Sequence, residues 1–241
     1  MFPLTLDIYF EIGAFIISLL CYQSIRDKPL KWFIPFLFFI ILVELTGRHI
    51  KKDLHLTNSW LYNICIPLEF SFYIFLFYKN YLNQLFRKTA MLLLIAFPLF
   101  CLVNIIFLQG FYDFNTNVLL AGNCIAIILC CQFFVDLFQR EEAINLLHEP
   151  MFWISTGLLF FNIGELSYSM FYQYLLQHRH DATGKLFILI HKNLIYFLYS
   201  FISIGILCTR IRYRRHKKPD SGTGSNIYLS MHIYNIICHP L

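Results

Sequence analysis

Several ionisable side chains interrupt the long apolar runs of this 241-residue sequence. Glu44, Glu69 and Glu165 lie in three different runs, and His191 and Lys192 lie together in a fourth. An isolated charge at membrane depth costs about 3 kcal/mol on insertion scales, so such residues usually face a protein interior or a water-filled cavity. These residue types therefore indicate the binding of a polar ligand, or the passage of protons or cations.

The spacing of these residues predicts how they share helix faces. Glu44 and Arg48 are four residues apart, which allows an ion pair along one helix. Asn162, Glu165 and Ser169 are three and four residues apart and form one polar stripe. Buried asparagines often serve only as hydrogen-bonding contacts between helices, whereas buried carboxylates need a partner. The candidate ligand-binding residues are Glu44, Arg48, Glu69, Asn104, Asn123, Asn162, Glu165, His191 and Lys192.

The elements that hold these residues are expected to be membrane-spanning helices. Apolar residues make up 58% of the chain and charged residues 14%, and an ordinary soluble domain carries about 25% charged residues. Since a membrane-spanning helix needs about 20 apolar residues, the runs predict an all-α, polytopic transmembrane helix bundle of about seven spans. A six-span bundle that loses one weak helix is the alternative. The predicted spans are residues 6–24, 31–50, 60–78, 89–109, 116–138, 151–176 and 186–208.

The distribution of Lys and Arg predicts the orientation of the bundle. Basic residues gather on the side that holds the C-terminus, above all in residues 210–218, whereas the opposite side has a smaller cluster at 48–52. Because cytoplasmic segments carry the excess of Lys and Arg, we expect the N-terminus outside and the C-terminus in the cytoplasm. Residues 1–218 then form the transmembrane bundle with a basic cytoplasmic end, and residues 219–241 form a flexible cytoplasmic tail. The basic segment is predicted to bind the headgroups of the lipid bilayer and no nucleic acid.

In this orientation the candidate residues lie in the middle and outer parts of the spans. The inner parts are almost free of ionisable groups, apart from Asp136 near one end. The pattern predicts a polar cavity that opens to the outside above an apolar floor. Within it we expect Lys192 to pair with Glu69 or Glu165, because one such pair relieves two buried charges.

Signals for catalysis, metals and cofactors are weak in this sequence. The cysteines show no metal-ligand spacing, and His178 and His180 belong to a short polar break typical of a solvated loop. Lys192 lies close to a predicted helix end, which argues against a retinal Schiff base. No phosphate-binding loop or nucleophile motif occurs. We therefore predict no catalytic residue, no metal ligand and no cofactor, and an enzyme is the least favoured class.

Three stretches, taken together, resemble a known family. They are Pro67–Phe70, Pro150–Leu159 and Ile190–Leu194. In their order and spacing the chain is similar, over residues 6–215, to the multi-pass N-terminal membrane region of certain bacterial sensor histidine kinases and to related free-standing membrane proteins. The resemblance implies a membrane sensing module in the bacterial inner membrane. The residues after the basic segment show neither a heptad pattern nor a phosphoacceptor segment, so we expect a separate cytoplasmic signalling partner, and a homodimer stays open.

Two functions follow from these observations. The first is a non-enzymatic sensor or receptor that detects a small or lipidic ligand from the outer side. The alternative is a small transporter or channel whose buried acidic residues carry protons or bind cations. A transporter requires polar residues along the inner halves of the spans, which this sequence largely lacks, so the receptor is the favoured hypothesis.

Overall fold

A computed structural model describes residues 6–140, 146–177 and 185–217, and this part of the chain contains helices and no strand. The predicted all-α class is confirmed. The predicted tail 219–241 and the polar break 178–184 lie outside the described residues. The elements are α1 (Leu6–Leu20), α2 (Tyr22–Ile25), η1 (Pro29–Trp32), α3 (Phe33–Lys52), α4 (Ser59–Asn80), α5 (Gln84–Val103), η2 (Asn104–Leu108), α6 (Thr116–Phe138), η3 (Leu146–His148), α7 (Pro150–Gln177) and α8 (Lys185–Lys217).

Five of the helices are long and apolar enough to cross a membrane, which fits a multi-pass membrane protein. The helix α1 has only 15 residues, fewer than the ~20 that usually span a bilayer. The helix α7 has 28 residues and is not among the five; Asn162 and Glu165 interrupt its apolar sequence. All seven predicted segments are therefore helical, and five of them meet the criteria of length and composition. These five are Pro29–Lys52, Ser59–Asn80, Gln84–Leu108, Thr116–Phe138 and Ile188–Ile211.

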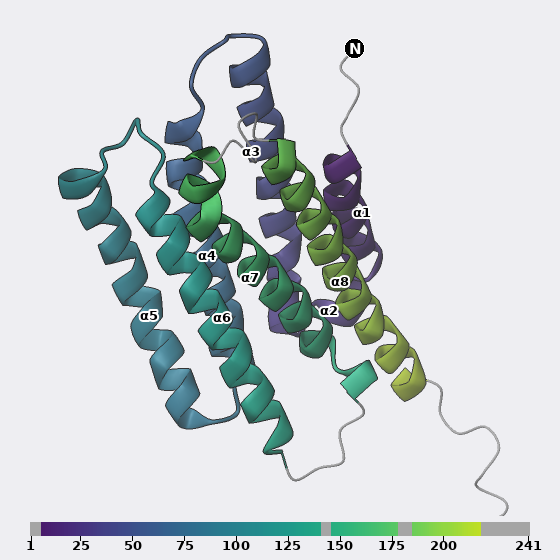
Figure 1. The fold of residues 1–241 in the computed structure, drawn as a ribbon. Coiled ribbons are helices and arrows are strands. Elements are labelled where there is room, and N and C mark those ends of the chain that lie inside the picture. Colours follow the sequence, from purple (N-terminus) through teal and green to yellow (C-terminus); the bar gives the residue numbers. More distant parts are fainter. Residues whose placement is uncertain (1–5, 141–145, 178–184, 218–241) are drawn as a thin grey trace, which may run out of the picture.

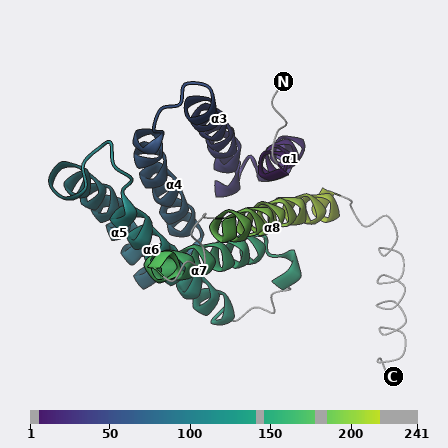
Figure 2. The ribbon, with the colours of Figure 1, turned by 45° about the horizontal axis from the view of Figure 1, so that its top comes forward.

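Six of the seven long helices form a closed ring. In order around the ring, α1 contacts α3, α3 contacts α4, α4 contacts α6, α6 contacts α7, α7 contacts α8, and α8 returns to α1. The helix α5 packs outside this ring, against α4 and α6 (Figure 1). The ring and the outer position of α5 are also visible when the top of the bundle comes forward (Figure 2). We call the end that holds the α3–α4 connection, residues 53–58, the upper end, and the end that holds the α4–α5 turn, residues 81–83, the lower end.

The lower half of the bundle is filled by aromatic and aliphatic side chains. The Phe36 ring stacks on the Phe72 ring with centroids 3.9 Å apart, and Phe33 meets Phe72 edge to face at 5.2 Å. Phe77 and Phe133 are fully buried and lie 6.1 Å apart between α4 and α6. We call these five rings the aromatic floor. Because lipid is as apolar as these side chains, close van der Waals packing of this kind is what holds membrane helices together.

Polar contacts attach the outer helix α5 at both of its ends. At the upper end, the Asn63 side chain of α4 donates hydrogen bonds of 2.7 Å to the carbonyl oxygens of Phe111 and Asp113 in the α5–α6 connection. The same side chain accepts a 3.0 Å hydrogen bond from the backbone N–H of Asn115. Loop backbone groups that would otherwise lack partners are satisfied in this way.

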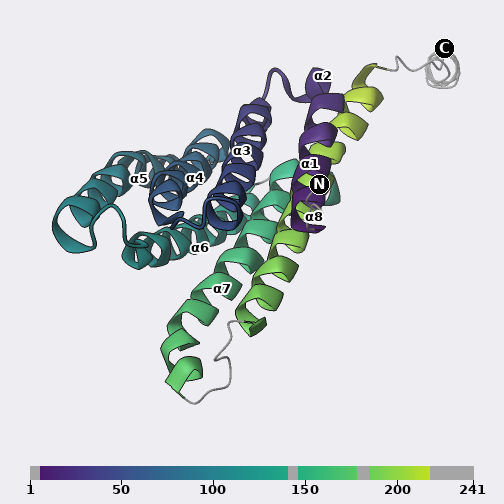
Figure 3. The same ribbon diagram turned by 90° about the horizontal axis from the view of Figure 1, so that it is seen from above.

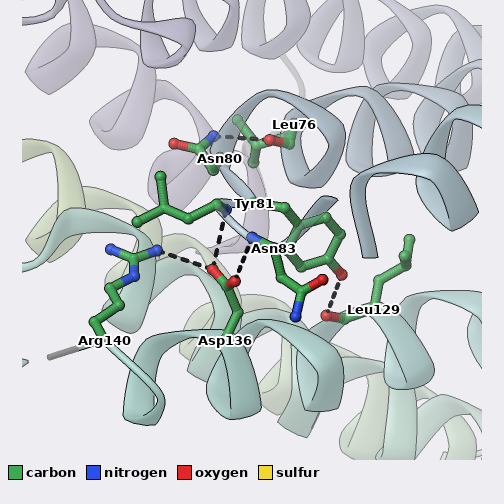
Figure 4. Close-up of polar contacts among 8 residues, drawn as sticks. Leu76, Asn80, Tyr81, Asn83, Leu129, Asp136 and Arg140 are labelled. Atoms are coloured by element: carbon green, nitrogen blue, oxygen red, sulfur yellow. Dashed lines mark hydrogen bonds and ion pairs between the residues drawn. The ribbon is translucent and has the colours of Figure 1, made fainter. Parts of the chain in front are cut away.

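At the lower end, Asp136 of α6 holds the α4–α5 turn (Figure 4). Its carboxylate accepts hydrogen bonds from the backbone N–H groups of Leu82, at 3.2 Å, and Asn83, at 2.7 Å. Arg140, two residues beyond the end of α6, donates to the same carboxylate at 3.2 Å. Asp136, the one ionisable group that the sequence analysis places near the inner end of a span, therefore has a structural role: it binds the turn and pairs with Arg140.

Small residues bring α7 and α8 into close contact, and the two helices run side by side (Figure 3). A Cβ atom added at Gly157 would lie 2.7 Å from the Phe201 Cβ, and one added at Gly205 would lie 2.7 Å from the carbonyl oxygen of Pro150. Glycine at such positions lets two helix backbones approach closely, which is a common device in membrane bundles. The α7–α8 pair is thus the most tightly joined pair of the ring.

This packing predicts that Gly205→Ala destabilises the protein by about 1–3 kcal/mol, because the obstructing atom belongs to the backbone and cannot rotate away. Thermal unfolding in detergent measures the effect. Gly13→Ala is the matched control, since a Cβ there meets nothing within 4 Å. Unfolding of the Gly205 variant at the wild-type temperature, or an equal loss in both variants, would contradict the close contact.

Candidate functional site

A cavity of about 690 Å³ lies inside the ring. Its walls are formed by residues of α1, α3, α4, α6, α7 and α8, and α5 contributes none of them. On α3 the wall extends from Ile40 to Lys52, and on α4 from Ser59 to Tyr73, so the cavity occupies the upper part of the bundle. The aromatic floor lies below it. A volume of this size is in the range of pockets that hold small molecules.

The structure brings most of the predicted site residues to this one cavity. They come from α3, α4, α6, α7 and α8, and the first and last of these helices are more than a hundred positions apart in the sequence. Their contribution to ligand binding stays a prediction, but their convergence is a property of the fold. The predicted site residues in the cavity wall are Glu44, Arg48, Glu69, Asn123, Glu165, His191 and Lys192.

Two predicted site residues lie elsewhere. Asn104 lies at the upper end of α5, which is outside the ring, so its side chain does not reach the cavity wall. It donates a 3.0 Å hydrogen bond to Gln109 and accepts one of 3.2 Å from Asn117. Asn162 is fully buried on α7, and its amide nitrogen donates at 2.6 Å to the carbonyl oxygen of Leu158 one turn earlier. Asparagine often satisfies itself on local backbone in this way. The Oδ1 atom of Asn162 finds no hydrogen-bond partner in the described part of the chain. Neither residue belongs to the cavity wall, and a role of either in ligand binding stays a prediction.

Arg48 is the central cation of the upper wall. Its guanidinium contacts the Asp7 carboxylate of α1, and its Nε atom lies 3.7 Å from Oε2 of Glu44 on its own helix. The ion pair predicted from the four-residue spacing of Glu44 and Arg48 is confirmed. The hydroxyl of Tyr62 on α4 also donates to Glu44, at 3.3 Å. Three helices are thus joined around one guanidinium group.

The acidic residues of α1 were not among the site residues predicted from the sequence. Asp7 and Glu11 both line the cavity, and both are buried at 6% and 3% exposure. They are four residues apart, so they lie on one face of α1. This spacing is the signal that places α1 in the wall, and a search for acidic pairs in the shortest span would have found it.

Glu165 of α7 pairs with His191 of α8. Oε1 of Glu165 is in hydrogen-bond contact with Nδ1 of His191, and the carboxylate is buried whereas the imidazole is about one third exposed. Lys192 was predicted to take this role. Among the described residues Lys192 forms no hydrogen bond or ion pair, although it borders the cavity. The partner of Glu165 is therefore His191, the residue directly before Lys192 on α8.

Other polar groups of the cavity are less fully paired. Glu69 accepts a 2.7 Å hydrogen bond from the Tyr73 hydroxyl one turn below it. Oε2 of Glu11 and both amide atoms of Asn123 are buried and find no hydrogen-bond partner within the described part of the chain. Buried polar atoms without a partner are rare in native structures, since each costs about 1–3 kcal/mol, and they often mark a site for water or a ligand.

Comparisons of the chain with protein-family models, with curated proteins and with solved structures find no match. The resemblance to the membrane region of sensor histidine kinases therefore stays a prediction from the three sequence stretches. Function has to be argued from the cavity itself.

The Glu165–His191 contact predicts a measurable coupling. Replacing His191 leaves the Glu165 carboxylate buried without this partner, so the free-energy losses of Glu165→Gln and His191→Gln should differ from additivity by about 0.5–3 kcal/mol. Equilibrium unfolding of the two single variants and the double variant in detergent gives this value. The matched cycle on Glu69→Gln and Lys192→Met should show a smaller coupling. A larger coupling in the second cycle would restore the pairing originally predicted from the sequence.

Proposed function

We propose that this chain is a receptor-type membrane protein that binds a small ligand in the upper cavity from the outer side of a bacterial inner membrane. The observation that carries the proposal is a cavity of about 690 Å³ with ionisable side chains in its largely apolar wall and a packed layer of aromatic rings as its floor. In this proposal the bundle has seven spans, with the N-terminus outside and the C-terminus in the cytoplasm.

The closed ring supports counting α1 and α7 as spans. Both are ring members with neighbours on two sides: α1 lies between α3 and α8, and α7 lies between α6 and α8. Removing either from the membrane would open the cavity wall and expose Glu11 or Glu165 to lipid, which is unfavourable for a charged group. The 15 residues of α1 continue into α2 after one non-helical residue, Cys21, and this extends the segment toward the lower end.

The positions of the basic residues support the orientation. The lower end holds Arg26, Lys79, Arg87 and Arg140, and α8 continues through the basic residues 210–217 on the same side. The upper end holds Lys51 and Lys52 at the end of α3. Since Lys and Arg are enriched in cytoplasmic segments, the lower end is assigned to the cytoplasm.

The floor favours a receptor over a transporter. The cavity wall ends near Ile40, Tyr73 and Tyr199, and the residues below these on α3 and α4 are buried and apolar, such as Leu37 and Phe77. A ligand that enters from the upper end would have to leave by the same way. Its binding could still shift the helices that surround it, and a separate cytoplasmic partner would read that shift at the lower end.

Orientation can be tested with single cysteines at the two ends, in a background without the native cysteines. Leu54 and Leu82 are suitable because they are exposed to similar extents, 53% and 68%, on opposite ends. We expect a membrane-impermeant maleimide to label Leu54→Cys in intact cells and Leu82→Cys only after permeabilisation. Labelling of Leu82→Cys in intact cells would reverse the orientation.

Access to the cavity can be tested on one helix. Ser169 lines the cavity, whereas Ser155 lies on the same helix, α7, and is fully buried in the lower half. A small, water-soluble methanethiosulfonate reagent added outside should modify Ser169→Cys and leave Ser155→Cys unmodified. Modification at both positions would indicate a path through the floor and favour transport. Protection of both would remove the proposed binding site.

A further inference from the structure

Carboxyl groups outnumber their cationic partners in the interior of the cavity. Arg48 engages two of them, and His191 engages a third. Within the described residues, no Lys, Arg or His forms an ion pair with either of the remaining two, Glu11 and Glu69. The five carboxyl groups of the wall are those of Asp7, Glu11, Glu44, Glu69 and Glu165.

The two remaining acids face the same space, because both line the cavity. Glu11 is 3% exposed, its Oε2 atom has no hydrogen-bond partner in the described structure, and it lies within electrostatic range of Glu69. Glu69 is ten residues below the start of α4, or about 15 Å along the helix axis. Two carboxylates that face one cavity disfavour each other's charge, and a positive charge between them would stabilise both.

The lysines of the cavity wall form no ion pair with either of these acids in the described part of the chain. Lys51 and Lys52 are the last two residues of α3 and are exposed at the upper end. Lys192 is seven residues from the start of α8, about 10 Å along the axis, and forms no ion pair with the described residues. Arg48 is within electrostatic range of Glu11 and His191 is within range of Glu69, but each of these cations already contacts another carboxylate. A cation that enters the cavity would be the first to form a direct ion pair with Glu11 and Glu69.

The geometry favours an organic cation over a metal ion. In the part of the chain that the structure describes, no three His, Cys, Asp or Glu side chains are grouped closely enough to bind one metal ion. The space of about 690 Å³ is far larger than an ion, so an extended molecule can reach acids on separate helices. Phe70, Tyr73 and Tyr199 line the same region, and aromatic faces attract ammonium groups.

We propose that the cavity binds a small organic ammonium compound, with its charged nitrogen between Glu11 and Glu69 and its apolar part against Tyr73 and Tyr199. The unpaired amide of Asn123 offers a donor and an acceptor to a further polar group of this ligand. The inference rests on the proposed function in one respect, because it requires the cavity to be open to the outer solution.

The first test uses the wild-type protein in lipid nanodiscs and three probes of similar shape: 2-phenylethylamine, 2-phenylethanol and phenylacetate. The amine is cationic at neutral pH, the alcohol is neutral and the acid is anionic. A ligand that binds the folded state raises the unfolding temperature with its concentration, and the titration gives an apparent Kd. We expect the amine to bind at least about tenfold more tightly than the alcohol, and phenylacetate to bind most weakly.

Variants assign the effect to the two acids. Glu11→Gln and Glu69→Gln keep the shape of each side chain and remove its charge, so each should weaken amine binding at least about tenfold and leave alcohol binding unchanged. Asp27→Asn is the matched control, because it removes one exposed carboxylate at the lower end. Equal binding of amine and alcohol, stronger binding of phenylacetate, or no stabilisation by any probe would overturn the proposal.

A second measurement separates this proposal from the proposed function. Ser169→Cys is treated with a trimethylammonium-bearing and a sulfonate-bearing methanethiosulfonate reagent, and Leu54→Cys in the upper connection serves as the reference. We expect the cationic reagent to react at least about tenfold faster at Ser169 relative to the reference, and Glu69→Gln to reduce this ratio. Equal relative rates would overturn the ammonium proposal while leaving an open cavity. Failure of both reagents at Ser169, with normal reaction at Leu54, would overturn the proposed function as well.

Discussion

Charged groups in an apolar bundle must face one another or water, and the architecture of this protein follows from that constraint. Arg48 meets it by contacting Asp7 of α1 and Glu44 of its own helix, which ties the short helix α1 to α3. Glu165 meets it through His191, which ties α7 to α8. These contacts lie on two sides of the ring, so the ionic contacts that surround the cavity also close its wall.

The ring divides the protein into two layers with different physical roles. In the upper layer polar side chains require partners and leave a space between the helices. In the lower layer the aromatic rings of Phe36, Phe72 and Phe77 pack without such a requirement. A cavity that carries ionisable side chains above a packed floor suits a molecule that receives a ligand on one side and transmits a change in helix position to the other, which is the basis of the proposed receptor function.

The outer helix α5 shows that hydropathy and position are separate properties. It belongs to the most apolar candidate span, Gln84–Leu108. In the 18 most apolar residues of that span only 17% are buried inside the molecule, the lowest share among the five spans. It is held at the upper end by Asn63 and at the lower end by Asp136, both of which bind backbone groups of its connections. Polar contacts at the two ends therefore fix a helix that apolar packing alone would leave free to move in lipid.

The sequence by itself determined where the helices lie and that they suit a membrane, because the length of an apolar run and the polar breaks around it are local properties. It also predicted the Glu44–Arg48 pair, since a four-residue spacing fixes two side chains on one helix face. Only the tertiary structure decided which helix is excluded from the ring, that Asp7 joins Arg48, and that Glu165 contacts His191 instead of Lys192. The reason is that lipid and the packed interior are equally apolar, so hydropathy does not reveal the rotation of a helix or the identity of its neighbours.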